Sequence, residues 1–124
     1  MEFRSNQTIA SQIAAYVKRE IFSGRYPPGS KVPPIREFAA FCCVNPNTVA
    51  KVYAELESEG LIRTDGTLGK FVAGDGALVA ARRAEYLAGR MREFREELRG
   101  CGVGAEEFES LAGAAAREAK GEEE

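Results

Sequence analysis

The segment that most constrains the fold runs from Pro33 to Gly60 and reads PPIREFAAFCCVNPNTVAKVYAELESEG. Its pattern predicts a helix, a tight turn at Cys43-Val44 and a second helix that begins at Asn45-Pro46. Asparagine is a favoured N-cap because its side-chain oxygen accepts a hydrogen bond from the unpaired N–H groups of the first turn. Proline is tolerated at the first helical position, where its missing N–H has no partner to lose. We therefore expect a helix-turn-helix.

The second helix of this segment has two unlike faces. Its apolar residues recur at i, i+3, i+4 and i+7 and predict a stripe that faces a core: Val49, Val52, Tyr53 and Leu56. Asn47 and Lys51 lie one turn apart on the opposite face, with Thr48 on the flank between them. A short helix with a polar, unobstructed N-terminal end fits the major groove of DNA. We predict that this is a recognition helix.

The residues before this segment predict one helix and one short strand. Thr8 is a suitable cap for a helix whose inward side repeats every four residues: Ile9, Ile13, Val17 and Ile21. Gly24 supplies a stop just after that helix. Four prolines between Arg25 and Pro34 exclude a further helix there, and Ser30 to Val32 predict a short strand. The next helix then starts near Pro34 with four residues inward: Ile35, Phe38, Ala39 and Cys42.

Two β-like runs follow the helix-turn-helix, LIRT at 61–64 and KFVA at 70–73. They flank the loop 65–69, which begins with Asp65-Gly66, and Asp-Gly between alternating apolar runs is a strong hairpin signal. The order helix, strand, helix, turn, helix, hairpin predicts a winged helix-turn-helix domain over residues 1–74. The expected fold class is therefore mainly α with a small β-wing.

Residues 75–124 predict a two-helix region with a disordered acidic tail. Apolar residues of the first helix alternate steps of four and three, as in a heptad pattern: Ala80, Ala84, Leu87, Met91, Phe94 and Leu98. The run from Gly100 to Gly104 ends it, and a last helix runs from Ala105 to about Lys120. A narrow apolar seam must be buried somewhere, so we predict a homodimer. Its interface is expected at six residues: Leu87, Met91, Phe94, Leu98, Phe108 and Leu111.

The composition excludes several classes of protein. The chain has no histidine, which excludes a His-bearing zinc site and an imidazole general base. It has no phosphate loop and no paired carboxylates tied to a pocket, so we expect no enzyme activity, no metal and no cofactor. No apolar run reaches the roughly 18 residues of a membrane span. Three unpaired cysteines are typical of a reducing cytoplasm.

The charge is unevenly distributed along the chain, although the net charge is only −2. Residues 1–74 carry nine Lys/Arg against seven Asp/Glu, whereas residues 75–124 carry eight against twelve. The half that contains the candidate recognition helix is therefore the basic half. So small a surplus permits DNA binding without demonstrating it.

The segment PGSKVPPIREFAAFCCVNPNTVAKVYAELESEGLIRT resembles the GntR family of bacterial transcription regulators, and the resemblance covers about residues 8–73. It carries Pro-Gly-x-x-hydrophobic-Pro-x-hydrophobic-Arg-Glu, then Val-Asn-Pro-Asn-Thr-Val, then Glu-Gly-Leu-Ile before the wing. The Asn45–Val49 motif with a short helical C-terminal region resembles the YtrA-like branch, in which two C-terminal helices dimerise the protein. The resemblance implies a dimeric regulator of double-stranded DNA, most often a repressor, that binds an inverted repeat.

The resemblance also implies which residues contact DNA. Arg36 matches a family position on the second helix that contacts DNA, and Gly69 matches a wing-tip glycine. Three residues match positions at or near the start of the recognition helix, with Lys51 one turn later: Asn45, Asn47 and Thr48. The wing departs from the family pattern, because Asp65-Gly66-Thr67-Leu68 stands where many relatives have basic residues. Pro34 likewise replaces the Ser or Thr that often caps the second helix.

Each of these residues also has a structural explanation. Asn45 is first of all a cap, and Thr48 is balanced between a phosphate contact and backbone capping. Asn47 suits bidentate pairing with adenine, and Lys51 suits a phosphate or a guanine. For both, and for Arg36, the alternative is a solvated side chain.

Two further alternatives concern the cysteines and the function itself. Cys42 and Cys43 are interpreted as small buried residues at the helix-turn junction, with a redox switch as the alternative. At the level of function, the alternative is a winged-helix module that binds proteins and not DNA. The sequence identifies no operator and no inducer, and it leaves an unidentified small-molecule effector open.

Overall fold

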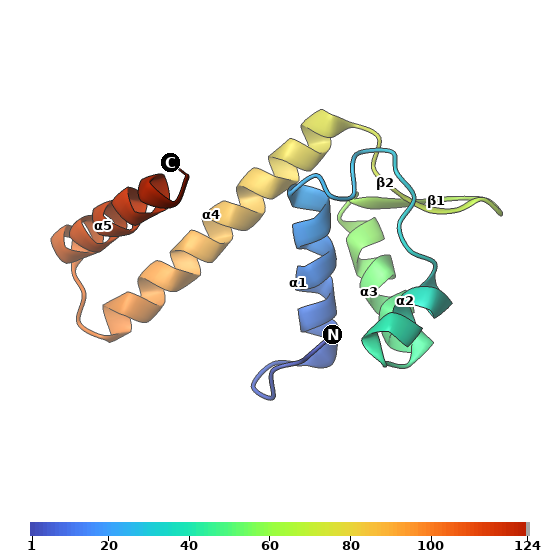
Figure 1. Ribbon diagram of the computed structural model, residues 1–124, viewed down its shortest axis with the longest axis horizontal. Helices are drawn as coiled ribbons and strands as arrows, with labels where there is room; N and C mark the ends of the chain where they lie inside the picture. Colours follow the sequence, from blue (N-terminus) through green and yellow to red (C-terminus); the bar gives the residue numbers. More distant parts are fainter. Residues whose placement is uncertain (124) are drawn as a thin grey trace. The chain divides into compact units, whose positions relative to one another are not determined.

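The computed structural model describes residues 1–123. Along them the helices are α1 Ile9–Phe22, α2 Ile35–Cys42, α3 Pro46–Ser58, α4 Gly76–Gly100 and α5 Ala105–Glu123 (Figure 1). The strands are β1 Ile62–Asp65 and β2 Gly69–Val72. The predicted fold class, mainly α with a small β-wing, is confirmed.

The chain divides into two compact units, and the boundary falls inside α4 between Arg83 and Ala84. The sequence predicts this boundary at residues 74–75, before the helix. The difference arises because Val79 is buried in the core of the first unit and Leu78 packs against it. The start of α4 therefore belongs to the winged-helix unit.

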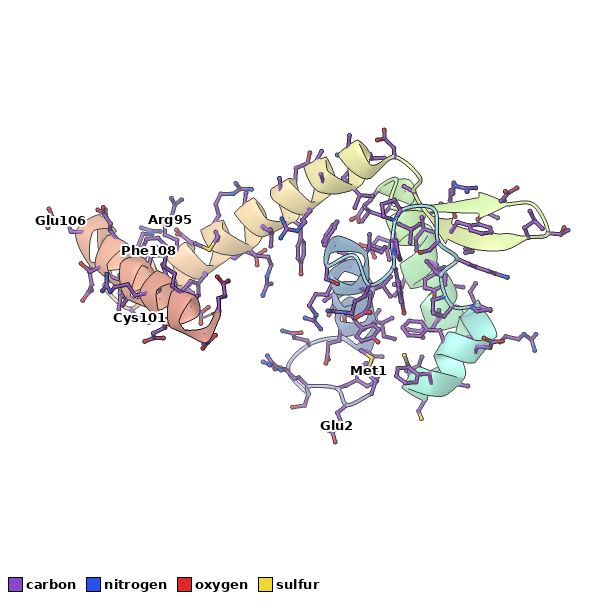
Figure 2. All side chains as sticks on the ribbon, turned by 45° about the horizontal axis from the view of Figure 1, so that its top comes forward. Met1, Glu2, Arg95, Cys101, Glu106 and Phe108 are labelled. Carbon is purple, nitrogen blue, oxygen red and sulfur yellow. The ribbon has the colours of Figure 1, made fainter. Side chains whose placement is uncertain are left out.

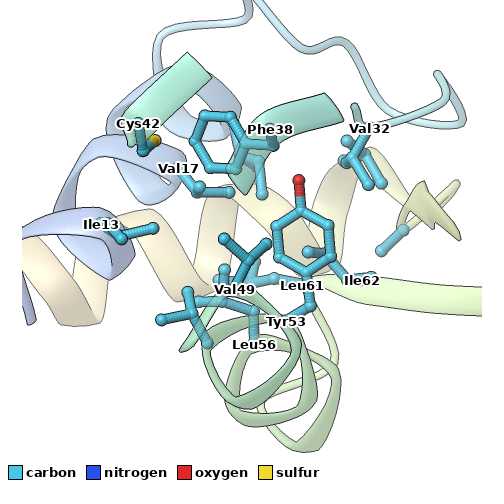
Figure 3. Packing of buried hydrophobic residues seen from close by; sticks show 14 of the residues in the cluster. Ile13, Val17, Val32, Phe38, Cys42, Val49, Tyr53, Leu56, Leu61 and Ile62 are labelled. Atoms are coloured by element: carbon cyan, nitrogen blue, oxygen red, sulfur yellow. The ribbon is translucent and has the colours of Figure 1, made fainter. Parts of the chain in front are cut away.

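The core of the first unit lies between α1, α2, α3 and the wing (Figure 3). The predicted apolar stripe of α3 is confirmed, since all four of its residues are buried: Val49, Val52, Tyr53 and Leu56. On α1, Ile13, Val17 and Ile21 are buried as predicted. Ile9 is 46% exposed, so its predicted burial is wrong. As the first residue of the helix, it lies one turn beyond the last residue that the core covers.

The ends of the first two helices follow their local sequence signals. The Thr8 hydroxyl oxygen accepts a hydrogen bond from the backbone nitrogen of Ser11 at 3.1 Å, which confirms the predicted cap of α1. Gly24 follows that helix with φ +84°, a conformation that glycine adopts without strain. Pro34 is the N-cap of α2 and makes no side-chain hydrogen bond there.

The wing is an antiparallel pair in which Ile62 lies opposite Val72 and Asp65 lies opposite Gly69. Its tip is therefore residues 66–68, two residues shorter than the predicted loop. The predicted strand at Ser30 to Val32 pairs with β2 through a single bridge between Lys31 and Phe71. This bridge attaches the segment before α2 to the wing.

The second unit contains the rest of α4 and all of α5. The turn between the helices passes through Gly102, with φ +86°, and the backbone nitrogen of Val103 donates to the Leu98 carbonyl oxygen at 3.1 Å. Cys101 lies in this turn and Phe108 on α5, and Figure 2 labels both. Residues 121–123, predicted as part of a disordered tail, are helical. The last residue of that tail, Glu124, lies outside the described residues.

Each helix along residues 1–123 is too short or too polar to cross a lipid bilayer.

Candidate nucleic-acid interface

The N-terminal end of α3 is exposed and carries the predicted reading residues. The Asn45 side-chain oxygen accepts a hydrogen bond from the backbone nitrogen of Asn47 at 2.8 Å, so its predicted role as cap is confirmed. Asn47 and Lys51 are exposed, and Thr48 is half-buried. The unpaired N–H groups of this helix end also favour negative charge, such as a phosphate. This end is therefore chemically suited to a DNA backbone.

The opposite face of α3 holds the helix in place. The Tyr53 ring stacks on Phe38 of α2 with ring centroids 6.1 Å apart. Its hydroxyl donates a hydrogen bond to the Pro33 carbonyl oxygen at 2.8 Å, and Figure 3 shows this oxygen pointing away from α3, between Phe38 and Val32. Burial raises the pKa of the Tyr53 phenol, so it remains a neutral hydrogen-bond donor. The Tyr53 side chain thus contacts both α2 and the segment before it, and it fixes the position of α3 relative to them.

The turn between α2 and α3 contains a left-handed residue that is not glycine. Cys43 has φ 58° and ψ 45°, and the backbone nitrogen of Val44 donates back to the Ala39 carbonyl oxygen at 3.0 Å. This bond closes the end of α2 and turns the chain toward the cap of α3. Cys43 is exposed, so its predicted burial is wrong, because its left-handed backbone turns the side chain toward solvent.

Cys42 is buried as predicted. Burial raises the pKa of its thiol. Its sulfur lies 3.8 Å from the sulfur of Met1, a residue of the N-terminal segment that Figure 2 labels. A buried thiol with a raised pKa forms little thiolate, which argues against the alternative of a redox switch at Cys42.

A polar network attaches α3 to the wing. Glu57 accepts a hydrogen bond from the Thr64 hydroxyl at 2.7 Å and pairs with the Lys70 ammonium at 3.5 Å. The Lys70 ammonium also donates to the Thr64 hydroxyl oxygen at 2.7 Å. The Thr64 hydrogen bond, followed by the charge of Lys70, lowers the pKa of Glu57. The wing is therefore joined to α3 by an ion pair and side-chain hydrogen bonds as well as by the backbone.

The wing carries less repulsion toward phosphates than its sequence suggests. Asp65 pairs with Arg63 at 3.5 Å, so its charge is partly balanced. Gly69 is the first residue of β2, beyond the tip, with φ +117°. A Cβ on Gly69 would stand 2.9 Å from the Lys31 Cε, so the lysine stem crosses directly over this glycine. The close approach of Lys31 is thus one structural reason for a glycine at position 69. The expected approach of the backbone to DNA is another.

A groove of about 470 Å³ brings two of the predicted DNA contacts together. Its walls are residues 31–36, Tyr53 and wing residues 64 and 66–70, so Arg36 and Gly69 both line it. The other predicted contacts, at the start of α3, lie outside its lining. The sequence did not point to Lys31 or Lys70, which also line the groove. Their only signal was a positive charge in or beside a predicted strand, and the register that brings them to the same groove as Arg36 depends on long-range pairing.

The six residues of the predicted dimer interface all lie in the second unit. Four of them are about half exposed: Leu87, Met91, Phe94 and Leu111. Leu98 and Phe108 are half-buried. Leu87, Met91 and Phe94 recur at steps of four and three, which places them on one face of α4. This unit therefore presents large apolar side chains to solvent.

A helix-turn-helix followed by a two-stranded wing defines a winged-helix protein, a class in which the second helix of the motif is presented to DNA. The sequence pattern of the bacterial regulatory proteins of the gntR family matches residues 9–72. The chain belongs to the GntR family, as predicted.

Three comparisons describe how close its relatives are. The chain is 34% identical to the HTH-type transcriptional repressor YtrA of Bacillus subtilis (strain 168) over 96 residues, which cover 77% of this chain and 69% of that protein. A GntR family transcriptional regulator from Listeria monocytogenes matches with a TM-score of 0.82 and 28% identity, over 90% of this chain and 98% of the other. AraR(DBD) in complex with operator ORR3 matches with a TM-score of 0.53 and 27% identity, over 59% of this chain and 86% of the other.

These matches agree with the predicted YtrA-like branch. The named relatives are transcriptional regulators, so the family is not one of enzymes.

Proposed function

We propose that this GntR-family regulator is a homodimeric repressor that binds an inverted-repeat operator in double-stranded DNA. The observation that carries the proposal is the two-sided character of α3. Its apolar side is fully packed in the core, while its N-terminal end exposes Asn47 and Lys51 to solvent. A helix held on one side and polar on the other is suited to enter a major groove.

The named relatives support the finer parts of this proposal. YtrA of Bacillus subtilis is named a transcriptional repressor, and the structure of AraR(DBD) contains an operator. By analogy, Arg36, Thr48 and Lys51 would contact phosphates and set the register. Asn47, with Lys51, would read base edges. The proposal does not require a small-molecule effector.

The exposed apolar face of the second unit supports the homodimer. Leu87, Met91 and Phe94 are each at least 43% exposed, which is unfavourable for large apolar side chains unless another surface covers them. A second copy of the chain would cover the same face symmetrically. Two winged helices would then be available for half-sites about one helical turn apart, roughly 34–36 Å.

Selection from random DNA, followed by footprinting of the enriched sequence, tests the proposal. We expect protection of two inverted half-sites about one turn apart at moderate salt. A module that binds only proteins would enrich no sequence and protect none. A single protected half-site would contradict the dimeric part of the proposal and leave DNA binding intact.

The matched control is a variant that changes the reading residues without disturbing the fold. Asn47→Ala with Lys51→Ala removes two exposed side chains, and neither of them packs in the core. We expect this variant to unfold at the same temperature as the wild type and to lose the footprint. Retention of the footprint would place the reading surface elsewhere.

A further inference from the structure

The groove between the wing and the start of α2 combines an apolar floor with positive charge. Pro33, Pro34 and Ile35 contribute apolar surface to it, and Leu68 of the wing tip lines it while remaining 63% exposed. Lys31 and Arg36 line it as well. Apolar surface beside cationic groups suits a ligand that alternates uncharged and anionic parts.

Several of the positive charges in the first 74 residues are already paired with carboxylates. Four of the nine lysines and arginines there form ion pairs with carboxylates: Lys18, Arg25, Arg63 and Lys70. Among the described residues, Lys31 and Arg36 have neither an ion pair nor a side-chain hydrogen bond. Lys70, although it lines the same groove, is held by Glu57 and Thr64. The free cations of the groove are therefore Lys31 and Arg36.

We propose that this groove receives one sugar-phosphate strand of the DNA, with Lys31 contacting a phosphate and Leu68 packing against an adjacent deoxyribose. This inference rests on the proposed DNA-binding function. To the contacts proposed for α3 and Arg36 it adds a contact between the groove and one sugar-phosphate strand. Arg36, which lines the groove, is itself one of the expected phosphate contacts of the helix-turn-helix. A DNA strand presents apolar sugar faces and anionic phosphates in alternation, which matches the composition of the groove.

The position of Lys31 explains how a wing without basic residues at its tip can contribute to binding. Its stem crosses Gly69 closely, because a Cβ on that residue would stand 2.9 Å from the Lys31 Cε and 3.5 Å from its Nζ. The bridge to Phe71 fixes the backbone of Lys31 to β2. The segment before α2 thus supplies to the wing the cation that the tip lacks.

The test measures the affinity of the full-length chain for its footprinted duplex as a function of salt concentration. We expect Lys31→Ala to lower the salt slope by about 0.9, the value for one phosphate contact in duplex DNA. Over a tenfold rise in salt, the wild type should then lose about eightfold more affinity than this variant. Lys31→Arg should retain the wild-type slope. Leu68→Ala should weaken binding at every salt concentration and leave the slope unchanged, because it removes an uncharged contact.

Arg19→Ala is the matched control, since Arg19 is exposed and has no ion pair in the described part of the chain. It lies in the last turn of α1, and the neighbouring Lys18 pairs with Glu59 at the C-terminal end of α3. Because α3 has 13 residues, this control is about 20 Å from the expected reading surface. We expect the Arg19→Ala slope to equal that of the wild type.

Equal slopes for Lys31→Ala and Arg19→Ala would overturn the inference and leave DNA binding by α3 intact. If the wild type protects no DNA at all, the proposed function itself fails. The two failures are therefore distinguishable. Lys31 and Leu68 are both exposed, so their substitution should leave the unfolding temperature unchanged.

Discussion

The Tyr53 hydroxyl on α3 donates a hydrogen bond to the carbonyl oxygen of Pro33, 20 residues earlier in the chain, across 2.8 Å. This bond joins α3, the proposed recognition helix, to the segment that precedes α2 and pairs Lys31 with the wing. The ring itself is completely buried. The relationship therefore positions both sides of the proposed DNA interface.

Tyr53→Phe should destabilise the protein by about 1 kcal/mol, because it keeps the ring but leaves a partly buried carbonyl oxygen without its donor. Urea denaturation with an unchanged m-value would measure this cost. Tyr16→Phe is the control, because within residues 1–123 the Tyr16 hydroxyl makes no hydrogen bond. Equal stability of the two variants would contradict the structural role of the Tyr53–Pro33 bond.

Cys43→Gly should stabilise the protein by about 1 kcal/mol. The left-handed conformation costs an ordinary residue about 1–2 kcal/mol, and part of that gain is offset by the greater freedom of glycine when unfolded. The exposed thiol would lose only its weak hydrogen bond to the Ala40 carbonyl oxygen, at 3.8 Å. Cys43→Val, whose branched side chain tolerates this conformation poorly, should destabilise. Unfolding midpoints in urea would rank the three proteins, and the reverse order would refute the prediction.

Lys51→Ala should weaken binding to all DNA sequences and lower the salt slope by about one, as expected for a phosphate contact. Asn47→Ala is the contrasting variant. It should leave the slope unchanged and reduce discrimination at one base pair by about 1–3 kcal/mol. Fluorescence anisotropy titrations at several salt concentrations measure both quantities. An unchanged slope for Lys51→Ala would reassign this residue to a base contact or to solvent.

Glu57→Gln should change how stability depends on pH. The lowered pKa of Glu57 means that its ionised form stabilises the folded state. That contribution is complete above the unfolded value of about 4.5 and is lost as the pH falls through the folded pKa. The wild type should therefore lose more thermal stability than Glu57→Gln between about pH 5 and pH 3. Because the Glu57 side chain is 37% exposed, the difference should be small.

The control for this pH series is Glu55→Gln. Glu55 is an exposed carboxylate on the same helix, and along residues 1–123 its side chain has no hydrogen-bonded partner. Thermal melts of this variant should fall in parallel with those of the wild type. If Glu57→Gln also runs parallel to the wild type, the link between α3 and the wing contributes nothing to stability.

The double variant Leu87→Glu with Phe94→Glu should be monomeric, because two carboxylates on the apolar face of α4 would have to be buried in the dimer. Sedimentation equilibrium would determine the mass of the wild type and the variant. Arg92→Glu changes the charge on another face of α4 and should remain dimeric. A dimer that survives the double substitution would place the interface elsewhere, and circular dichroism should show unchanged helix content.

Much of the first unit could be predicted because its signals are local. The start of α3 depends on Asn45 and Pro46, which act within one helical turn, and its buried face follows from the period of the helix. The cap at Thr8 and the stop at Gly24 have the same character. These features need no information about the rest of the chain.

Features that depend on contacts between distant segments were missed. The sequence predicted a strand at Ser30 to Val32 but not the register that places Lys31 over Gly69. It did not show that Glu57 and Thr64 hold Lys70, or that Arg63 partly balances Asp65. The sequence placed the domain boundary at residues 74–75, whereas the structure divides between Arg83 and Ala84. The burial of Val79 in the first unit, which accounts for the difference, depends on packing of the start of α4 against distant segments.

By itself the sequence determined the order of the elements, the two faces of α3 and the identity of the family, because caps, prolines and hydrophobic period act over a few residues. Only the tertiary structure decided which charges are free. A lysine on a wing is available to DNA or already neutralised according to which carboxylate lies within about 4 Å of it. That distance is set by the packing of segments far apart in the sequence. It leaves Lys31 and Arg36 free beside one groove and holds Lys70 against Glu57.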